Sequence, residues 1–301
     1  MPADNPYQSG QAVTRAIHDA ARTRASATGE NVGDLTRQAY FDRFLCRVFA
    51  DDDERFALKG GMGMLARFPR SRHTRDIDLE RADSTIETAV ADLRIRAEAD
   101  LGDYFRFAYV THTEAMHEGR VTGEPGTKIT FEIYIEARSL GRCSVDVAIH
   151  PRPAIDFEIK DPSSRLHLPR LTTSPYVIIA IEDQIADKLC AMRGTFGSGQ
   201  ESSRVKDLVD LGLIALAGAP RADRLRLAID AESSRRELLP ATEVTVPGNW
   251  ASTYAKLIRE NGLVAAPQTA SAALALVRGM VMPVLQGKAT GVWDPRIQAW
   301  A

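Results

Sequence analysis

The sequence has few of the features that mark secreted, membrane-bound or zinc-binding proteins. Its 301 residues include three cysteines, Cys46, Cys143 and Cys190. They are too few and too scattered for a disulfide framework or a zinc site. No apolar run reaches the length of a signal peptide core, or the roughly 20 residues of a membrane span. These absences predict a soluble, cytoplasmic protein in a reducing compartment, with no membrane partner.

A large excess of charge is missing as well. The formal net charge is −2, with 26% charged and 44% hydrophobic residues, which is ordinary for a soluble globular protein. A polyanion would therefore have to be bound by a local patch rather than by the whole surface. Arginines do cluster at Arg67, Arg70, Arg72 and Arg75. They are either phosphate or RNA contacts or the charges of a solvated loop.

Hydrophobic periodicity predicts an α+β fold, a mixed sheet with helices packed on it, for residues 1–160. Helical spacing of apolar residues marks the stretches 8–27, 33–50 and 84–101. Strand-like patterns mark the stretches 55–60, 74–80, 105–116, 128–138 and 142–150. A sheet with helices on it is a common way to bury both kinds of pattern in one core.

The pattern changes after residue 160. A proline-marked stretch, 161–175, is typical of a linker. Helices are predicted near 181–194 and 204–218. Further helices follow, broken at Pro240, Pro247, Pro267 and Pro283. We therefore expect a second, mainly helical lobe over residues 161–301.

Two aspartates on one predicted strand are the first candidates for chemistry. Asp76 and Asp78 in "TRDIDLE" share one face of the strand, while Ile77 points into the core. Gly60 and Gly61 precede them, and glycines let a backbone approach phosphates at a helix start. Mg²⁺ commonly binds one or two carboxylates plus substrate phosphates. The pattern indicates a metal–nucleotide site, or else a strand face with solvated aspartates.

Two further residues add to this site in one interpretation. Asp146 in "CSVDVAI" either completes a three-carboxylate cluster able to hold two divalent ions or faces water on an edge strand. Lys59, next to the glycines, either contacts phosphate or caps its strand.

Four motifs in one order then resemble a known family. They are "FALKGGMGML", "RHTRDIDLE", "IEDQIADKLCAM" and "RVKDLVDLGLI", and they lie within residues 55–216. Together they resemble the AbiEii/MenT-type nucleotidyltransferase toxins of the DNA polymerase β-like nucleotidyltransferase superfamily. The resemblance implies a nucleotidyltransferase-fold N-terminal lobe followed by a helical lobe.

The resemblance also assigns roles to particular residues. Asp76 and Asp78 match the metal-binding pair, and Lys188 matches the lysine that meets the triphosphate as a point charge. Asp210 matches the second-lobe aspartate. Asp207, three residues earlier on the same helical face, remains the alternative to Asp210.

The implied activity is the transfer of a nucleoside monophosphate from an NTP, with CTP favoured, to the 3′ end of tRNA. Mg²⁺ or Mn²⁺ would serve as cofactor and pyrophosphate would be released. Such a toxin blocks aminoacylation and growth, and a cognate antitoxin neutralises it. The alternatives are a nucleotidyltransferase that modifies a protein side chain or a small molecule, and an inactive binding partner.

Two expectations concern regulation and assembly. A phosphate added to Ser71 or Thr74, beside the carboxylates, would repel an incoming nucleotide. The sequence shows no long heptad repeat or apolar stripe, which favours a monomer.

Overall fold

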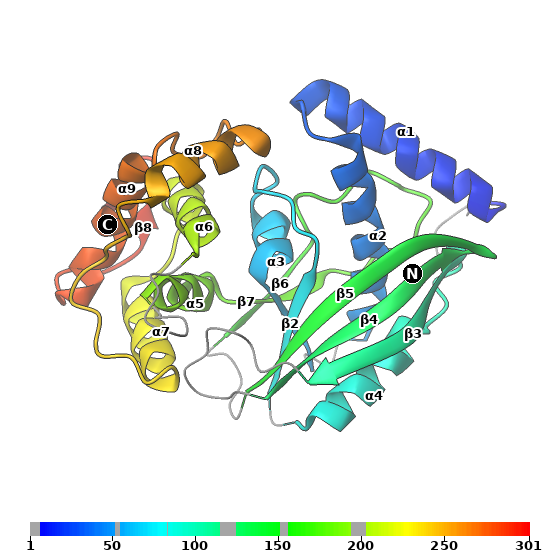
Figure 1. The fold of residues 1–301 in the computed structure, drawn as a ribbon, viewed down its shortest axis with the longest axis horizontal. Helices are drawn as coiled ribbons and strands as arrows, with labels where there is room; N and C mark the ends of the chain where they lie inside the picture. Colours follow the sequence, from blue (N-terminus) through cyan, green and yellow to red (C-terminus); the bar gives the residue numbers. More distant parts are fainter. Residues whose placement is uncertain (1–6, 52–54, 83, 115–124, 151–155, 194–202) are drawn as a thin grey trace.

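A mixed β-sheet and a group of helices stand side by side in the computed structural model (Figure 1). The structure describes residues 7–51, 55–82, 84–114, 125–150, 156–193 and 203–301. The helix α3 lies between the two halves (Figure 1). The α+β class expected from the sequence is confirmed.

Within the described residues the main sheet has seven strands in the order β3-β4-β5-β2-β1-β7-β6. The strands are β1 (Ala57–Lys59), β2 (Ile77–Ala82), β3 (Phe105–Glu114), β4 (Gly126–Ile135), β5 (Arg138–His150), β6 (Phe157–Lys160) and β7 (Tyr176–Ile179). β2 runs parallel to β5 and β1 runs parallel to β7, while the other neighbours are antiparallel. The two parallel pairs bring together strands that lie far apart in the sequence.

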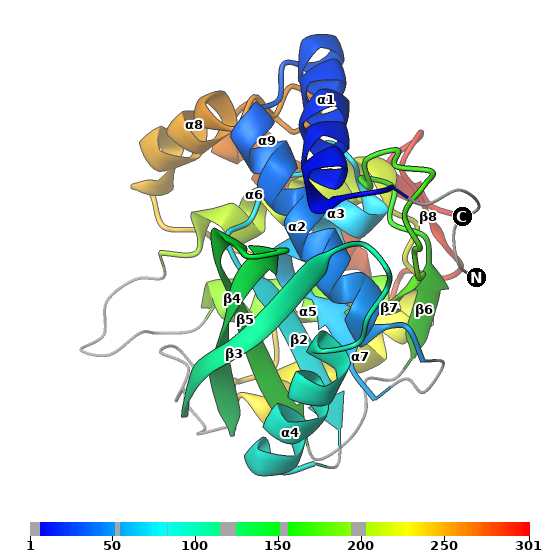
Figure 2. The same ribbon diagram turned by 90° about the vertical axis from the view of Figure 1, so that its right-hand side faces the viewer.

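Four of the helices in the described residues accompany this sheet. They are α1 (Gly10–Thr28), α2 (Val32–Val48), α3 (Gly60–Arg67) and α4 (Ile86–Ala97). α2 packs on the sheet through Phe44, whose ring centroid lies 5.3 Å from that of Phe107 and 5.1 Å from that of Phe131. Figure 2 shows α2 crossing the sheet, with α4 below it and α1 outside it. The sheet face that meets α2 is therefore the apolar one.

The remaining helices form the second half. They are α5 (Ile181–Arg193), α6 (Val205–Ala217), α7 (Ala222–Arg235), α8 (Trp250–Glu260) and α9 (Ala270–Leu285), followed by the short strands β8 (Trp293–Asp294) and β9 (Ala299–Trp300). Pro283 was expected to break a helix, but it lies inside α9. Only two residues follow it in the helix, so the proline removes a hydrogen bond near the end instead of in the middle. No described helix is long and apolar enough to span a membrane.

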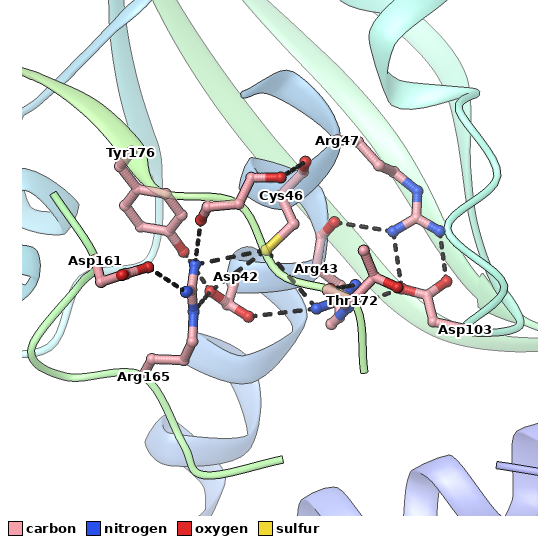
Figure 3. Close-up of polar contacts among 10 residues, drawn as sticks. Asp42, Arg43, Cys46, Arg47, Asp103, Asp161, Arg165, Thr172 and Tyr176 are labelled. Carbon is pink, nitrogen blue, oxygen red and sulfur yellow. Dashed lines mark hydrogen bonds and ion pairs between the residues drawn. The ribbon is translucent and has the colours of Figure 1, made fainter. Parts of the chain in front are cut away.

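The segment predicted as a linker is packed against α2 (Figure 3). Arg165 donates to Asp42 Oδ1 at 2.8 Å and to the carbonyl of Ser174 at 2.6 Å. Arg43 donates to the carbonyl of Thr172 at 2.8 Å. Residues 161–175 therefore connect β6 to β7 along α2 instead of spacing two lobes apart. The two strands were missed because each has only four residues beside a proline-rich stretch.

A buried ion cluster joins α2 to the turn before β3 (Figure 3). Asp103 accepts from Arg43 Nε at 2.7 Å and from Arg47 Nη2 at 2.5 Å. These three residues are at most 1% exposed. Burial alone would raise the pKa of Asp103, but Arg47 and Arg43 outweigh it and hold that pKa below its usual value.

The buried hydrophobic residues form two clusters. The first runs from Val13 to Ile179, and the second runs from Ile185 to Trp293 and also includes Met64 of α3. This supports a division into two lobes as a proposal. Because β7 belongs to the main sheet, the change lies between Ile179 and Ile185, later than the boundary after residue 160 that the sequence indicates.

Candidate active site

A row of charged residues crosses four neighbouring strands. Lys59 is the register partner of Asp78, Asp78 of Asp146, and Asp146 of Lys128. Ile77, beside Asp78 in the chain, is fully buried. Since side chains alternate along a strand, the apolar neighbours face the helices and this charged row faces the opposite side of the sheet.

The glycine pair lies against the side chains of Asp78 and Thr74. Gly60 has a φ of +61°, and a Cβ there would lie 1.9 Å from Asp78 Oδ2. A Cβ on Gly61 would lie 2.7 Å from the Cβ of Thr74. Only glycine allows both the backbone conformation and this close approach. The pair also forms the first turn of α3, where backbone N–H groups have no partner within the helix.

Asp76, Asp78 and Asp146 form one wall of the candidate site, and the nearby lysines compensate their charge only in part. Burial, with Asp76 and Asp146 adding to it, raises the pKa of Asp78 to about 6. Burial also raises the pKa of Asp146 above its usual value, although Lys128 Nζ lies 3.5 Å from Asp146 Oδ2. Asp146 Oδ1 is buried and accepts no hydrogen bond from the described residues. Thr74 Oγ1 donates to Asp76 Oδ1 at 2.5 Å, and Asp76 lies just before β2 instead of within it.

This wall fits a hydrated divalent cation. Within the described part of the chain, no three Asp, Glu, His or Cys side chains converge as a ready-made metal centre. Mg²⁺ needs fewer protein ligands than that, because it keeps several waters and takes substrate phosphate oxygens. The carboxylates of Asp76 and Asp78, with the orphaned oxygen of Asp146 beside them, supply the oxygen donors that such an ion prefers.

The opposite wall is built from α5 and α6. Lys188 Nζ donates to Asp210 Oδ2 at 2.5 Å and to Asp207 Oδ1 at 3.2 Å. Arg72 forms a two-pronged contact with Asp210, Nε to Oδ1 at 3.1 Å and Nη2 to Oδ2 at 2.9 Å. Burial disfavours the charged amine, but Asp210 and Asp207 outweigh it and raise the pKa of Lys188. Lys188 therefore carries its positive charge throughout the neutral range.

Asp210 and Asp207 occupy different places in this arrangement. Asp210 is fully buried, and it is absent from the lining of the cleft, whereas Asp207, Lys188 and Arg72 belong to that lining. Burial would raise the pKa of Asp210, but Arg72 and Lys188 hold it below the usual value. Asp210 therefore holds Lys188 and Arg72 on the side away from the cleft, whereas Asp207 lines the cleft itself.

Both walls enclose a cleft of about 260 Å³. Among the described residues, its charged lining contains six cations and five carboxylates. The cations are Lys59, Arg72, Lys188, Arg204, Lys206 and Arg236, and the carboxylates are Asp76, Asp78, Asp146, Asp187 and Asp207. Acidic groups dominate the sheet side, whereas four of the cations come from residues 188–236. The cleft can thus receive a cation on one side and an anion on the other.

Four of these lining residues were not singled out from the sequence. They are Asp187, Arg204, Lys206 and Arg236, and Arg236 donates to Asp187 Oδ1 at 2.6 Å. Arg204, Lys206 and Asp187 stand inside or beside the motifs already quoted, which was an available signal. Arg236 follows α7, far from those motifs in the sequence, and nothing in the sequence near it points to the cleft.

Gln184 ties the two walls together at the glycine pair. Its Nε2 donates to the carbonyl of Gly60 at 3.0 Å, and its Oε1 accepts from Arg67 Nη1 at 2.9 Å. Arg67 also donates to the carbonyl of Ile179 and pairs with Glu158 Oε1 at 3.1 Å. The structure corrects the predicted role of Arg67 as a phosphate contact. Its side chain is buried among these protein partners and does not line the cleft.

The other residues predicted in the segment 70–75 differ in whether they line the cleft. Arg72 lines the cleft, while Arg70 and Arg75 are exposed outside its lining. Thr74 also lines the cleft. Ser71 is 3% exposed, and its hydroxyl donates to the carbonyl of Phe68 at 2.8 Å. Thr74 is therefore the accessible one of the two hydroxyls.

A family model described as the nucleotidyl transferase AbiEii toxin of a type IV toxin–antitoxin system matches residues 43–275, well over half of the chain. The chain belongs to the AbiEii family. It is a nucleotidyltransferase, and the family implies an antitoxin partner. The resemblance noted in the sequence and the expected enzymatic activity are confirmed.

Solved structures similar to this chain include two bacterial proteins. MenT4, a nucleotidyltransferase toxin from Mycobacterium tuberculosis, is 16% identical over 91% of this chain and 98% of its own, with a TM-score of 0.50. JHP933 from Helicobacter pylori is 13% identical over 86% of this chain and 96% of its own, with a TM-score of 0.47. A search of curated proteins found no match. The similarity to MenT4 concerns the fold alone at this level of identity.

Proposed function

We propose that this AbiEii-family enzyme transfers a nucleoside monophosphate from an NTP, with CTP favoured, to the 3′-terminal hydroxyl of tRNA. The acceptor oxygen forms a bond to the α-phosphorus as the bond to the bridging oxygen breaks, and pyrophosphate leaves. The observation that carries the proposal is the cleft with Asp76 and Asp78 on one wall and Lys188 on the other. The product would block aminoacylation and growth.

Asp76, Asp78 and, next to them, Asp146 would hold Mg²⁺ or Mn²⁺. When bound, the ion lowers the pKa of the acceptor hydroxyl and neutralises phosphate charge. Thr74 orients the Asp76 carboxylate through its hydrogen bond. Gly60 and Gly61 let the triphosphate approach the backbone N–H groups of the first turn of α3.

Lys188 and Arg72 would meet the triphosphate and stabilise the charge that develops on the departing pyrophosphate. Asp210 acts as a positioning residue, because it contacts both cations from the buried side. Lys59 adds a cation beside Asp78 from the neighbouring strand. Catalysis in this scheme comes from placement and electrostatics, with no covalent protein intermediate.

The acceptor would be reached through cations at the rim. Arg204 and Lys206 line the cleft, and Arg70 and Arg75 are exposed near it in sequence. These few charges on a nearly neutral protein predict modest RNA affinity that falls with salt.

We further propose that the protein is monomeric and cytoplasmic. We also propose that a phosphate on Thr74 would regulate it, because the phosphate would repel the nucleotide. Ser71 would have to leave its buried position to be modified.

The test supplies each labelled NTP with Mg²⁺ to separate pools of tRNA, protein and small hydroxyl compounds. We expect label on tRNA, with sequencing showing an added 3′ pyrimidine. Asp78→Asn should abolish the product, while Asp161→Asn, the same exchange at an 82% exposed side chain, should leave it unchanged. Label in the protein or small-molecule pool would refute the tRNA acceptor, and no label in any pool would refute nucleotide transfer to these acceptors.

A further inference from the structure

The end of α1 lies near the loop that joins α3 to β2 (Figure 1), and Arg24 of α1 contacts this loop at Pro69. Arg24 donates to Glu30 through Nε at 2.8 Å and through Nη2 at 3.1 Å. The same guanidinium donates to the carbonyl of Pro69 at 2.9 Å and to the carbonyl of Ser164 at 2.7 Å. One side chain therefore joins the α1–α2 turn, the loop at Pro69 and the segment that runs along α2.

Glu30 contacts the same loop directly, at His73. His73 Nε2 lies 3.4 Å from Glu30 Oε1, and the two side chains are only 12% and 15% exposed. The residues on either side of His73 face the cleft, since Arg72 pairs with Asp210 and Thr74 donates to Asp76. Successive side chains of this segment thus point in opposite directions. Fixing His73 on the outside fixes its two neighbours on the inside.

We propose that Arg24 and Glu30 are positioning residues for the active site, acting through the loop 69–76. Both lie outside residues 43–275, the part that matches the family. The α1–α2 turn would then hold the loop 69–76 from outside the part of the chain that matches the family. The effect of Arg24 and Glu30 on catalysis rests on the proposed function, whereas their effect on the loop does not.

Arginine is suited to this task. Its planar fork serves several acceptors at once, and here these are one carboxylate and two carbonyl oxygens. A lysine offers a point charge without the fork. Arg24→Lys should therefore keep part of the Glu30 contact and lose at least one carbonyl contact.

The first test measures amide hydrogen exchange of the full chain without nucleotide. Arg24→Met removes the charge-assisted bond to the Pro69 carbonyl, and Glu30→Gln removes the carboxylate that holds Arg24 and lies beside His73. Both should therefore speed exchange in residues 70–76 by about tenfold. Arg15→Ala is the matched control on the same helix, because its pair with Asp19 is exposed. It should leave residues 70–76 unchanged. Equal exchange in Arg24→Met and wild type would overturn the proposal.

The second test measures kcat/KM and NTP affinity in a double-mutant cycle. Arg24→Met should weaken both about tenfold, with Arg24→Lys in between. In an Arg72→Gln background, Arg24→Met should weaken both quantities less than it does in wild type, since part of its effect passes through Arg72. Full additivity would refute this route. If wild type neither binds nor transfers an NTP, the proposed function fails, and the exchange measurement still decides whether Arg24 holds the loop.

Discussion

Lys188 has two carboxylate partners, the buried Asp210 and Asp207, which lines the cleft. Replacing each carboxylate in turn by an amide should distinguish their roles. Asp210 is fully buried and accepts three hydrogen bonds from two cations. Asn at this position keeps the shape and removes the charge, which leaves Arg72 without its carboxylate partner and Lys188 with Asp207 alone. Breaking a buried ion pair in this way costs about 3–5 kcal/mol of unfolding free energy.

Asp207 makes a weaker contribution. It accepts one bond from Lys188 at 3.2 Å and lies 4.0 Å from Arg204. A single hydrogen bond to a charged group contributes about 1.5–3 kcal/mol, so Asp207→Asn should destabilise the fold less than Asp210→Asn.

Urea denaturation without nucleotide measures both stabilities, and initial transfer rates measure activity. Misplacement of reacting groups by about 1 Å can cost roughly 100-fold in rate. We expect Asp210→Asn to lose about that much in kcat/KM, and Asp207→Asn to lose roughly tenfold or less. If Asp207→Asn proves equal to or worse than Asp210→Asn in both assays, the assignment of Asp210 as the support of the two cations is wrong.

Three further outcomes are expected. Gly60→Ala should lose about 100-fold in transfer rate, because the new Cβ would lie 1.9 Å from Asp78 Oδ2, while Gly63→Ala, whose nearest neighbour is 3.5 Å away, should stay near wild type. Asp103→Asn should lower the unfolding free energy by about 3–5 kcal/mol near neutral pH. Calorimetry should therefore give Asp103→Asn a much lower unfolding free energy than the control Asp161→Asn. Removal of divalent metal with EDTA should stop transfer, and Mg²⁺ or Mn²⁺ should restore it; a chelated enzyme that keeps its rate would contradict a metal site.

The pH dependence of the Asp103 effect follows from the direction of its shift. The folded pKa of Asp103 lies below the ordinary 3.8. Its ionised form therefore stabilises the fold above about pH 3.8, and this contribution disappears as the pH falls through the folded pKa. The difference between wild type and Asp103→Asn should shrink on acidification. A difference that stays constant down to about pH 2 would show that the substitution disturbs packing instead of charge.

Local pattern was enough to find the acidic wall. Alternation in "TRDIDLE" predicted that Asp76 and Asp78 share a side, and both line the cleft. The resemblance supplied Lys188 and Asp210, which periodicity alone would have left on the surface. Both are buried instead, because they compensate each other's charge.

What the sequence missed depends on contacts between distant segments. Arg67 looked like its neighbour Arg72, yet its partners come from α5, β6 and the end of β7. The Lys128 partner of Asp146 depends on the register of β4 with β5. Arg236 reaches the cleft only because α7 packs beside α5. None of these contacts follows from the spacing of residues along the chain.

The hydrogen bond from Gln184 to the carbonyl of Gly60 has a consequence for protein engineering. The two halves of the chain depend on each other. An N-terminal fragment that ends at Ile179 would keep the carboxylates of the site and lose Lys188. Its Met64 would also lose the apolar neighbours on α5 and α6 with which it packs. Splitting the gene at this junction should give two inert products. Activity should return only when both are co-expressed and reassociate along α3.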